Sequence, residues 1–133
     1  MTIFNQFVTD LKRGAAFYHG TMKFPLAAEI PMEDGGIVLL DAGTAYLSLI
    51  RCDRLPDDVF PTVLTVEDDE KKLSALKAAG YREICDPVTL PVGVIRFTQS
   101  PTGTKGAWIR YDAYALKNAA ETSSARDDWM DRL

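Results

Sequence analysis

The pattern of apolar and polar positions is repeated along the chain. Residues 3–51 and 61–112 each open with a short apolar run that ends in Val-x-Asp. Each continues with a segment of helical spacing that ends in an aromatic residue, and then with two strand-like stretches around a small turn. A doubled unit of this kind predicts a concave site built from equivalent positions of the two halves.

The spacing within each half predicts one helix. Apolar residues recur at helical intervals from Leu11 to about Met22, directly after Asp10, a residue type that commonly caps helices. A second helix is expected over residues 70–79 and should end at Gly80.

Short runs bounded by turn residues predict the strands. We expect strands at 3–8, 26–31, 36–41, 45–52, 62–66, 82–87, 93–98 and 107–113. The predicted fold class is α+β, with two tandem βαβββ modules forming cupped mixed or antiparallel sheets, each covered on one face by a helix.

The repeats define a single predicted domain over residues 1–113, made of repeats 3–52 and 61–113. The polar segment 53–60 between them is predicted to be a linker. Residues 114–133 have no counterpart in the first half and form a C-terminal extension, in which Ser123–Leu133 is either a short helix or a disordered tail.

Composition argues against some partners. The 133 residues carry a formal net charge of −4 and contain no long run of Lys or Arg, so neither nucleic acid nor an anionic membrane is the expected partner. No apolar stretch reaches the roughly 18–20 residues that span a bilayer, and no secretory signal is visible. The two cysteines, Cys52 and Cys85, are expected to be reduced thiols in a cytoplasmic protein.

The motifs of both halves resemble those of the vicinal oxygen chelate superfamily, which includes glyoxalase I, bleomycin-resistance proteins and extradiol dioxygenases. The segment from Val8-Thr9-Asp10-Leu11 to Phe17-Tyr18, followed by Met22-Lys23-Phe24, is similar to the opening of that family. In the second half, Val66-Glu67-Asp68 through Gly80-Tyr81 and the turn Ser100-Pro101-Thr102-Gly103 are similar to its later motifs. The resemblance implies a cupped sheet that holds a ligand, formed within one chain or across a homodimer.

Metal-dependent members of that family hold a divalent ion at four strand positions. Counting back from the two Val-x-Asp motifs places the first-strand positions at Ile3 and Pro61, and the two last-strand positions fall at about Ser48 and Arg110. Isoleucine and proline offer no side-chain lone pair, and arginine is a fixed cation. We therefore expect no metal, no cofactor and no catalytic residues, since the lone His19 lies on a helix and suits neither a metal site nor a catalytic triad.

Strand alternation predicts which side chains line the cup. In the last strand of the second half, Trp108 and Arg110 are expected to face the groove, whereas Ile109 and Tyr111 should face the core beside Leu47 and Leu49. The expected lining combines aromatic rings with polar groups that could pair with an anionic ligand. The predicted ligand-binding residues are Asn5, Phe7, Tyr46, Ser48, Thr65, Arg96, Trp108 and Arg110.

These features lead to three hypotheses. The first is a metal-independent binder of bleomycin-resistance type that sequesters an aromatic or anionic drug or metabolite. The second is an enzyme of the same superfamily, a lyase or isomerase. The third is a structural dimer whose cup is filled by its own side chains.

Overall fold

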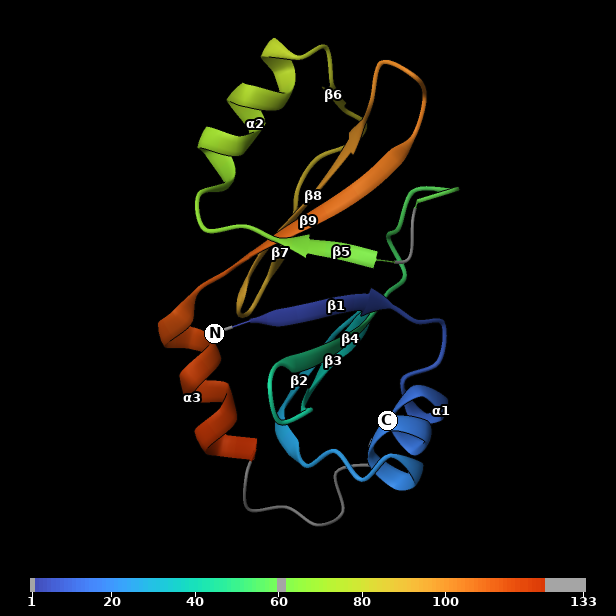
Figure 1. The fold of residues 1–133 in the computed structure, drawn as a ribbon, viewed down its shortest axis with the longest axis vertical. Coiled ribbons are helices and arrows are strands. Elements are labelled where there is room, and N and C mark those ends of the chain that lie inside the picture. Colours follow the sequence, from blue (N-terminus) through green and yellow to red (C-terminus); the bar gives the residue numbers. More distant parts are fainter. Residues whose placement is uncertain (1, 60–61, 124–133) are drawn as a thin grey trace.

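The computed structural model describes residues 2–59 and 62–123, which contain two βαβββ repeats (Figure 1). The elements of the first repeat are β1 (Ile3–Phe7), α1 (Leu11–Ala15) with its π-helical continuation η1 (Ala16–Thr21), β2 (Leu26–Met32), β3 (Gly35–Asp41) and β4 (Tyr46–Cys52). Those of the second repeat are β5 (Thr62–Thr65), α2 (Asp69–Ala78), β6 (Arg82–Glu83), β7 (Val88–Leu90), β8 (Gly93–Gln99) and β9 (Lys105–Tyr111). A third helix, α3 (Ala113–Ser123), follows β9.

The first helix begins directly after Asp10, as the sequence predicts, and α2 begins at Asp69, one residue before its predicted start. The Asp10 carboxylate accepts a hydrogen bond from the backbone N–H of Arg13 at 3.1 Å, and Asp68 accepts one from Lys71 at 3.0 Å. Gly80 ends the second helix with a φ of 90°, a conformation that glycine adopts without a steric penalty.

Two predicted elements differ from the structure. Of the strand expected at 82–87, only β6 (Arg82–Glu83) forms, and β7 (Val88–Leu90), which was not expected, pairs with β8 directly after Pro87, a residue with no backbone N–H to donate to a ladder. Together, β6 and β7 take the place of β2 in the second repeat. The second difference is α3, which begins at Ala113, whereas the sequence suggests a helix only from Ser123 onward. Asp112 caps it by accepting a hydrogen bond from the backbone N–H of Ala115 at 2.9 Å. The helix considered near the C-terminus falls on residues 124–133, outside the described part of the chain.

All strands belong to one mixed sheet with the order β2-β3-β4-β1-β5-β9-β8-β6, and β7 also pairs with β8. Within each repeat the first strand lies parallel to the last, and β1 and β5 join the repeats as antiparallel neighbours. The predicted α+β class with two βαβββ modules is confirmed.

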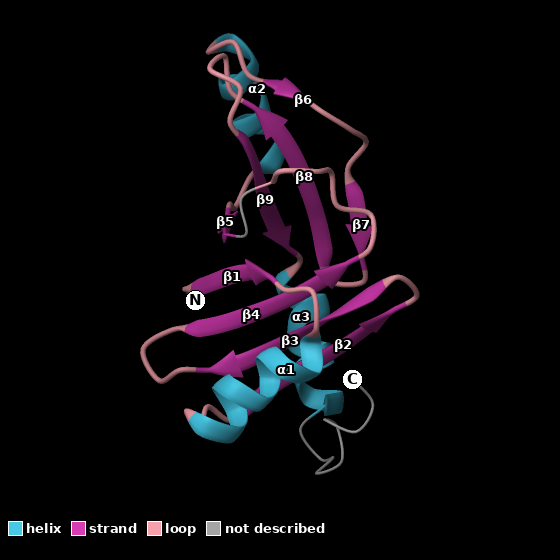
Figure 2. Cartoon of the chain, turned by 90° about the vertical axis from the view of Figure 1, so that its right-hand side faces the viewer, coloured by secondary structure: helices cyan, strands magenta, loops and turns pink. Residues whose placement is uncertain are grey.

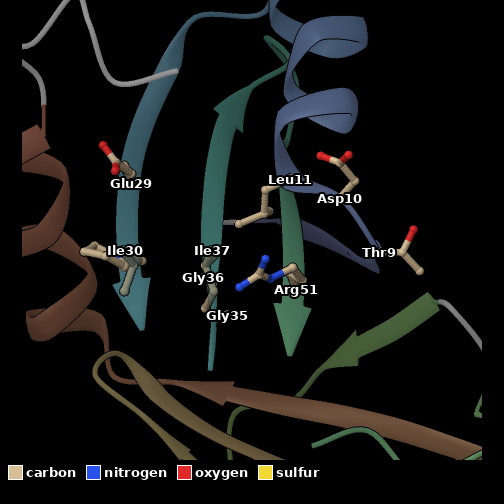
Figure 3. Close-up of a pocket in the computed structure, with 10 residues that line it drawn as sticks. Thr9, Asp10, Leu11, Glu29, Ile30, Gly35, Gly36, Ile37 and Arg51 are labelled. Atoms are coloured by element: carbon tan, nitrogen blue, oxygen red, sulfur yellow. The ribbon is translucent and has the colours of Figure 1, made fainter. Parts of the chain in front are cut away.

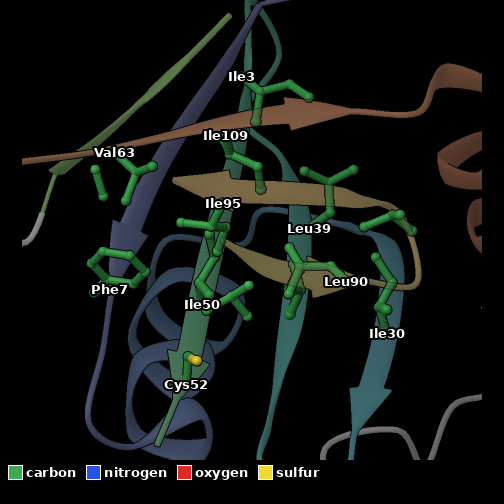
Figure 4. Packing of buried hydrophobic residues seen from close by; sticks show 14 of the residues in the cluster. Ile3, Phe7, Ile30, Leu39, Ile50, Cys52, Val63, Leu90, Ile95 and Ile109 are labelled. Atoms are coloured by element: carbon green, nitrogen blue, oxygen red, sulfur yellow. The ribbon is translucent and has the colours of Figure 1, made fainter. Parts of the chain in front are cut away.

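The sheet curls so that its two halves share one hydrophobic core. β3 and β8 are five steps apart in the strand order, which in a flat sheet would separate them by about 24 Å. Their side chains nevertheless belong to the same buried cluster, and Phe7 stacks with Phe97 at a ring-centroid distance of 6.2 Å. We call the face that carries this cluster the inner face (Figure 4).

The outer face of the sheet is the one on which α1 and α2 lie. In the first repeat, Leu11 and Ala15 of α1 pack against Val38, Leu40 and Leu49 of the strands in a second buried cluster. Figure 2 shows α1 in front of β3 and β4, with α3 behind them. On that opposite side, α3 packs against β2 and contributes Leu116, which is 3% exposed, to the inner core.

Candidate functional site

The structure divides the eight predicted ligand-binding residues between the two faces of the sheet. Asn5, Phe7, Tyr46, Ser48 and Thr65 lie on the inner face, where they pack in the shared core or bond to one another. Arg96, Trp108 and Arg110 lie on the outer face, beside α2. The sequence therefore predicted the wrong side of the sheet for these three residues. Ile109 and Tyr111 face the inner core and not, as expected, the side that carries Leu47 and Leu49.

The cause is the register of β9. In the structure Val38 pairs with Leu49 and Arg96 pairs with Trp108, so Leu49 and Trp108 occupy equivalent positions of the two repeats. The loop between β8 and β9 is one residue longer than the loop between β3 and β4. Sequence comparison instead aligned Ser48 with Arg110. Because side chains alternate along a strand, a shift by an odd number of residues moves every side chain to the other face.

The inner face is filled by apolar side chains. Ile37, Ile50, Ile95, Phe97 and Ile109 are at most 1% exposed, so the cup that the sequence predicts as a ligand site is occupied by the core itself (Figure 4). The described cavities that are large enough for a small molecule lie elsewhere, on the outer face and at the rim.

A hydrogen-bonded polar network lies where the two repeats meet. The Tyr111 hydroxyl donates to Asn5 Oδ1 at 2.6 Å and also bonds to the Ser48 hydroxyl at 2.8 Å. Asn5 Nδ2 donates to Thr65 Oγ1 at 2.6 Å and to the backbone carbonyl of Val63 at 3.1 Å, and Thr65 donates to the carbonyl of Ile3 at 3.1 Å. The polar groups that the sequence assigned to a ligand therefore bond to each other.

Tyr111 is the member of this network that sequence reasoning missed. Burial raises its pKa to about 12, although the hydrogen bond with Ser48 acts in the opposite direction. A phenol with this pKa remains protonated at neutral pH and does not serve as a general base. The network joins β1, β4, β5 and β9 and stabilises the junction of the repeats.

On the outer face, ion pairs hold the start of α2 against the strands. The buried carboxylate of Asp69 accepts hydrogen bonds from Arg96 Nε at 2.8 Å and from Arg110 Nε at 2.9 Å. Arg96 Nη1 also donates to Glu83 at 2.8 Å. Burial alone would raise the pKa of Asp69, but the hydrogen bonds from Arg96 and Arg110 outweigh it, so the pKa lies below its ordinary value.

These ion pairs replace the apolar contacts of the first repeat. Asp69 stands where the first repeat has Leu11, and Arg96 stands where it has Val38. The rest of α2 does not pack tightly on the strands. A groove with a volume of about 710 Å³ lies between α2, β5 and the β8–β9 hairpin.

Trp108 forms part of the wall of this groove. Its side chain is buried, and its indole Nε1 has no hydrogen-bond partner among the described residues. Lys72 approaches from α2 and Lys105 from β9. The remaining lining consists of apolar side chains (Leu64, Val66, Leu76, Tyr81, Ala107), hydroxyl side chains (Thr65, Thr98, Ser100, Thr102, Thr104) and Gly106.

The sequence comparison decides the family. Residues 2–111 match the Glyoxalase/Bleomycin resistance protein/Dioxygenase superfamily. The chain belongs to this superfamily. No curated protein is significantly similar to it in sequence.

Solved structures of the superfamily fold are similar to this chain. Methylmalonyl-CoA epimerase from Mycobacterium tuberculosis superposes with a TM-score of 0.57 at 16% identity, over 83% of this chain and 86% of the epimerase. Streptomyces coelicolor methylmalonyl-CoA epimerase, in complex with 2-nitronate-propionyl-CoA, superposes with a TM-score of 0.58 at 16% identity, over 85% of this chain and 97% of the epimerase. A hypothetical protein from Bacillus halodurans C-125 superposes with a TM-score of 0.57 at 18% identity, over 83% of this chain and 92% of that protein. At these identities the similarity shows the fold alone.

The residues of this chain do not fit the metal of the metal-dependent superfamily members. Ile3 is apolar and Ser48 bonds to Tyr111. The residue of β9 that is equivalent to Ser48 is the apolar Ala107, and Arg110 lies on the outer face in an ion pair with Asp69. Within residues 2–59 and 62–123, no group of three His, Cys, Asp or Glu side chains could hold a metal ion.

Among the helices of the described residues, none is long and apolar enough to cross a membrane.

Proposed function

We propose that this protein binds a small organic anion with an aromatic or apolar body, without a metal, in the groove beside Trp108. The ligand is held and released unchanged, so the protein sequesters a drug or metabolite in the manner of bleomycin-resistance proteins. The observation that carries the proposal is the groove of about 710 Å³, which has a buried tryptophan in its wall and two lysines among its lining residues.

The chemistry of the groove supports an anion with an apolar body. Leu64, Leu76 and Tyr81 offer apolar surface, and pockets of roughly 300–1,000 Å³ with such linings are typical of small-molecule sites. Lys72 and Lys105 bring positive charge from two different elements. A carboxylate or sulfonate near these lysines could also accept a hydrogen bond from Trp108 Nε1 after a small movement of the ring, which would remove a buried unpaired donor.

The proposal differs from the sequence-based hypothesis in the location of the site. The cup is occupied by the shared core, and Asn5, Ser48 and Thr65 are engaged with each other and Tyr111. Of the eight predicted ligand-binding residues, Trp108 and Thr65 line the groove. A reducing cytoplasm, which the sequence predicts as the location, would keep Cys52 and Cys85 as the free thiols seen here.

The test uses 8-anilinonaphthalene-1-sulfonate, an aromatic anion whose fluorescence rises in apolar sites, and then a thermal-shift screen of aromatic carboxylates. We expect saturable binding that Trp108→Phe weakens and that Lys72→Gln combined with Lys105→Gln weakens further. Lys117→Gln, at an exposed position on α3 away from the groove, is the matched control. Equal binding by all variants would refute the proposal, provided that circular dichroism shows each variant to be folded.

A second candidate function, a structural homodimer with a filled cup, is favoured by an exposed apolar pair on the outer face. The antiparallel register of β1 and β5 places Phe4 and Leu64 next to each other, and they are 63% and 68% exposed. A second copy of the chain could cover them. Sedimentation of the wild type and of Phe4→Asp distinguishes the two functions, since Phe4 does not line the groove. A dimer that the variant dissociates, together with no binding of the aromatic anions, would favour the structural role.

A further inference from the structure

A second cavity, of about 370 Å³, lies on the outer face of the first repeat (Figure 3). Figure 3 shows Arg51 at its centre, below Leu11 and beside Gly35 and Gly36 of β3. Asp10 lies to one side of Arg51 and Glu29 to the other. This cavity shares no lining residue with the groove beside Trp108.

Arg51 and Arg110 are equivalent residues of the two repeats. The residue after each arginine pairs with a glycine, Cys52 with Gly35 and Tyr111 with Gly93. A Cβ atom on Gly35 would lie 1.9 Å from the carbonyl oxygen of Arg51, and one on Gly93 would lie 2.0 Å from that of Arg110. Both repeats therefore hold the backbone of the arginine in the same close contact.

The two arginines differ in their partners. Arg110 Nε donates to the buried carboxylate of Asp69 at 2.9 Å. The first repeat has Leu11 at the position of Asp69, so it supplies no carboxylate there. Arg51 Nε is buried and has no hydrogen-bond partner among the described residues. Its ion pair with Asp53 spans 3.9 Å, too far for a hydrogen bond, and both of those side chains are substantially exposed.

Comparison of the two repeats thus shows that the first repeat lacks a carboxylate to accept a hydrogen bond from the Nε of its arginine. A carboxylate placed beside Arg51, as that of Asp69 is placed beside Arg110, would satisfy the buried Nε with a charge-assisted hydrogen bond. The side chain of Arg51 is 42% exposed and lines the cavity. A ligand carboxylate that enters the cavity can therefore pair with Arg51 beside Leu11, as the internal carboxylate of Asp69 pairs with Arg110 in the other repeat.

The other charges around the cavity specify the ligand further. The carboxylate of Asp10 accepts the capping hydrogen bond from Arg13 and has capacity for another donor, and Glu29 adds a second carboxylate to the wall. A simple anion would be repelled by these two groups, whereas an ammonium group would be attracted to Asp10. We infer that this cavity binds a small zwitterion, a free amino acid or a related amino carboxylic acid, through its carboxylate to Arg51 and its ammonium group to Asp10.

The test is a titration followed by NMR, with the Nε–H signal of Arg51 as the reporter. The probes are glycine and L-leucine as zwitterions, acetate and methylamine as their separate halves, and inorganic phosphate as a competing anion. We expect saturable shifts of the Arg51 signal with glycine or L-leucine and much weaker responses to the other three probes. Stronger binding of acetate or phosphate than of either amino acid, or no response to any probe, would overturn the inference.

Three variants assign the contacts. Arg51→Gln is expected to weaken amino acid binding about tenfold or more, measured by calorimetry, because it removes the charged donor. Asp10→Asn keeps a residue that caps helices equally well, so it should weaken the binding of glycine but not that of acetate. Leu11→Asp supplies the internal carboxylate of the second repeat and should abolish binding. If Leu11→Asp fails to fold, the first two variants decide, and unchanged glycine affinity in Arg51→Gln refutes the inference.

Discussion

At the scale of single residues, Tyr111 determines the chemistry of the inner face. Its hydroxyl completes the network with Asn5 and Ser48, both of which are at most 2% exposed. A network in which every polar group has a partner specifies one arrangement of the strands, whereas a network that loses one member leaves buried groups unpaired.

We expect Tyr111→Phe to lower the free energy of unfolding by about 1–3 kcal/mol, because Asn5 Oδ1 loses its donor in a buried site. Urea unfolding measures this as a lower midpoint with an unchanged slope. Tyr114→Phe, at a position that is 77% exposed, is the control and should have no effect. A Tyr111→Phe variant as stable as the wild type would show that water or another group replaces the hydroxyl.

The same tyrosine predicts a loss of stability at high pH. Its pKa is about 12 in the folded protein, against an ordinary value near 10, so the unfolded chain releases the proton first. Stability from this group is fully present below about pH 10 and is lost as the pH rises toward 12. Between these values the wild type should lose on the order of 2 kcal/mol more than Tyr111→Phe does.

Asp69 predicts a loss of stability at low pH, the opposite of the effect expected from Tyr111. Its pKa is lowered in the folded protein, so its contribution is present above the ordinary value of about 4 and is lost as the pH falls through the folded pKa. Asp69→Asn should destabilise the protein at neutral pH and show a weaker dependence of stability on pH below about 4. Urea midpoints measured from pH 7 downward test this, with Asp86→Asn as a control at an exposed position. Parallel pH profiles for Asp69→Asn and wild type would contradict it.

At the scale of elements, what the sequence predicts depends on whether the signal is local. The cap Asp10 and the stop at Gly80 act within one turn of helix, and the structure confirms both. The phase of β9 depends on the length of a loop and on pairing with β8, which no local pattern reveals, so Trp108 and Arg110 were assigned to the wrong face.

The helix α3 had a local signal that was read as part of a strand. Asp112 is followed by Ala-Tyr-Ala-Leu, a capping residue before good helix formers, but the preceding β-rich run extended the predicted strand to Ala113. The position of α3 could not be predicted in the same way. It packs against β2 of the other repeat, and that contact is set by the curl of the whole sheet.

Leu116 tests the role of α3. It is 3% exposed and belongs to the inner core, so Leu116→Ala should lower the free energy of unfolding by about 2–5 kcal/mol. Tyr114→Ala on the exposed side of the same helix is the control, since it changes helix propensity but buries little. Equal stability of the two variants would mean that α3 does not pack on the inner core in solution.

At the scale of the whole molecule, the two repeats depend on each other for burial. Each contributes one wall of the inner core, and a module of about 50 residues that kept its own wall exposed would be only marginally stable. The closing of the walls also explains why the candidate ligand sites lie outside the cup. Duplication has here produced a shared core, with the open cavities displaced to the outer face, where the helices of the two repeats differ.

This dependence predicts a single unfolding transition. Ile37→Val lies in the first repeat and Ile95→Val at the equivalent position of the second, and both side chains are at most 1% exposed. Each should lower the free energy of unfolding by about 0.5–1.5 kcal/mol and shift the whole transition, whether it is followed by tryptophan fluorescence or by far-ultraviolet circular dichroism. If each substitution instead shifted a separate step, with the two probes no longer coincident, the repeats would be independent units and the inner core would not hold them together.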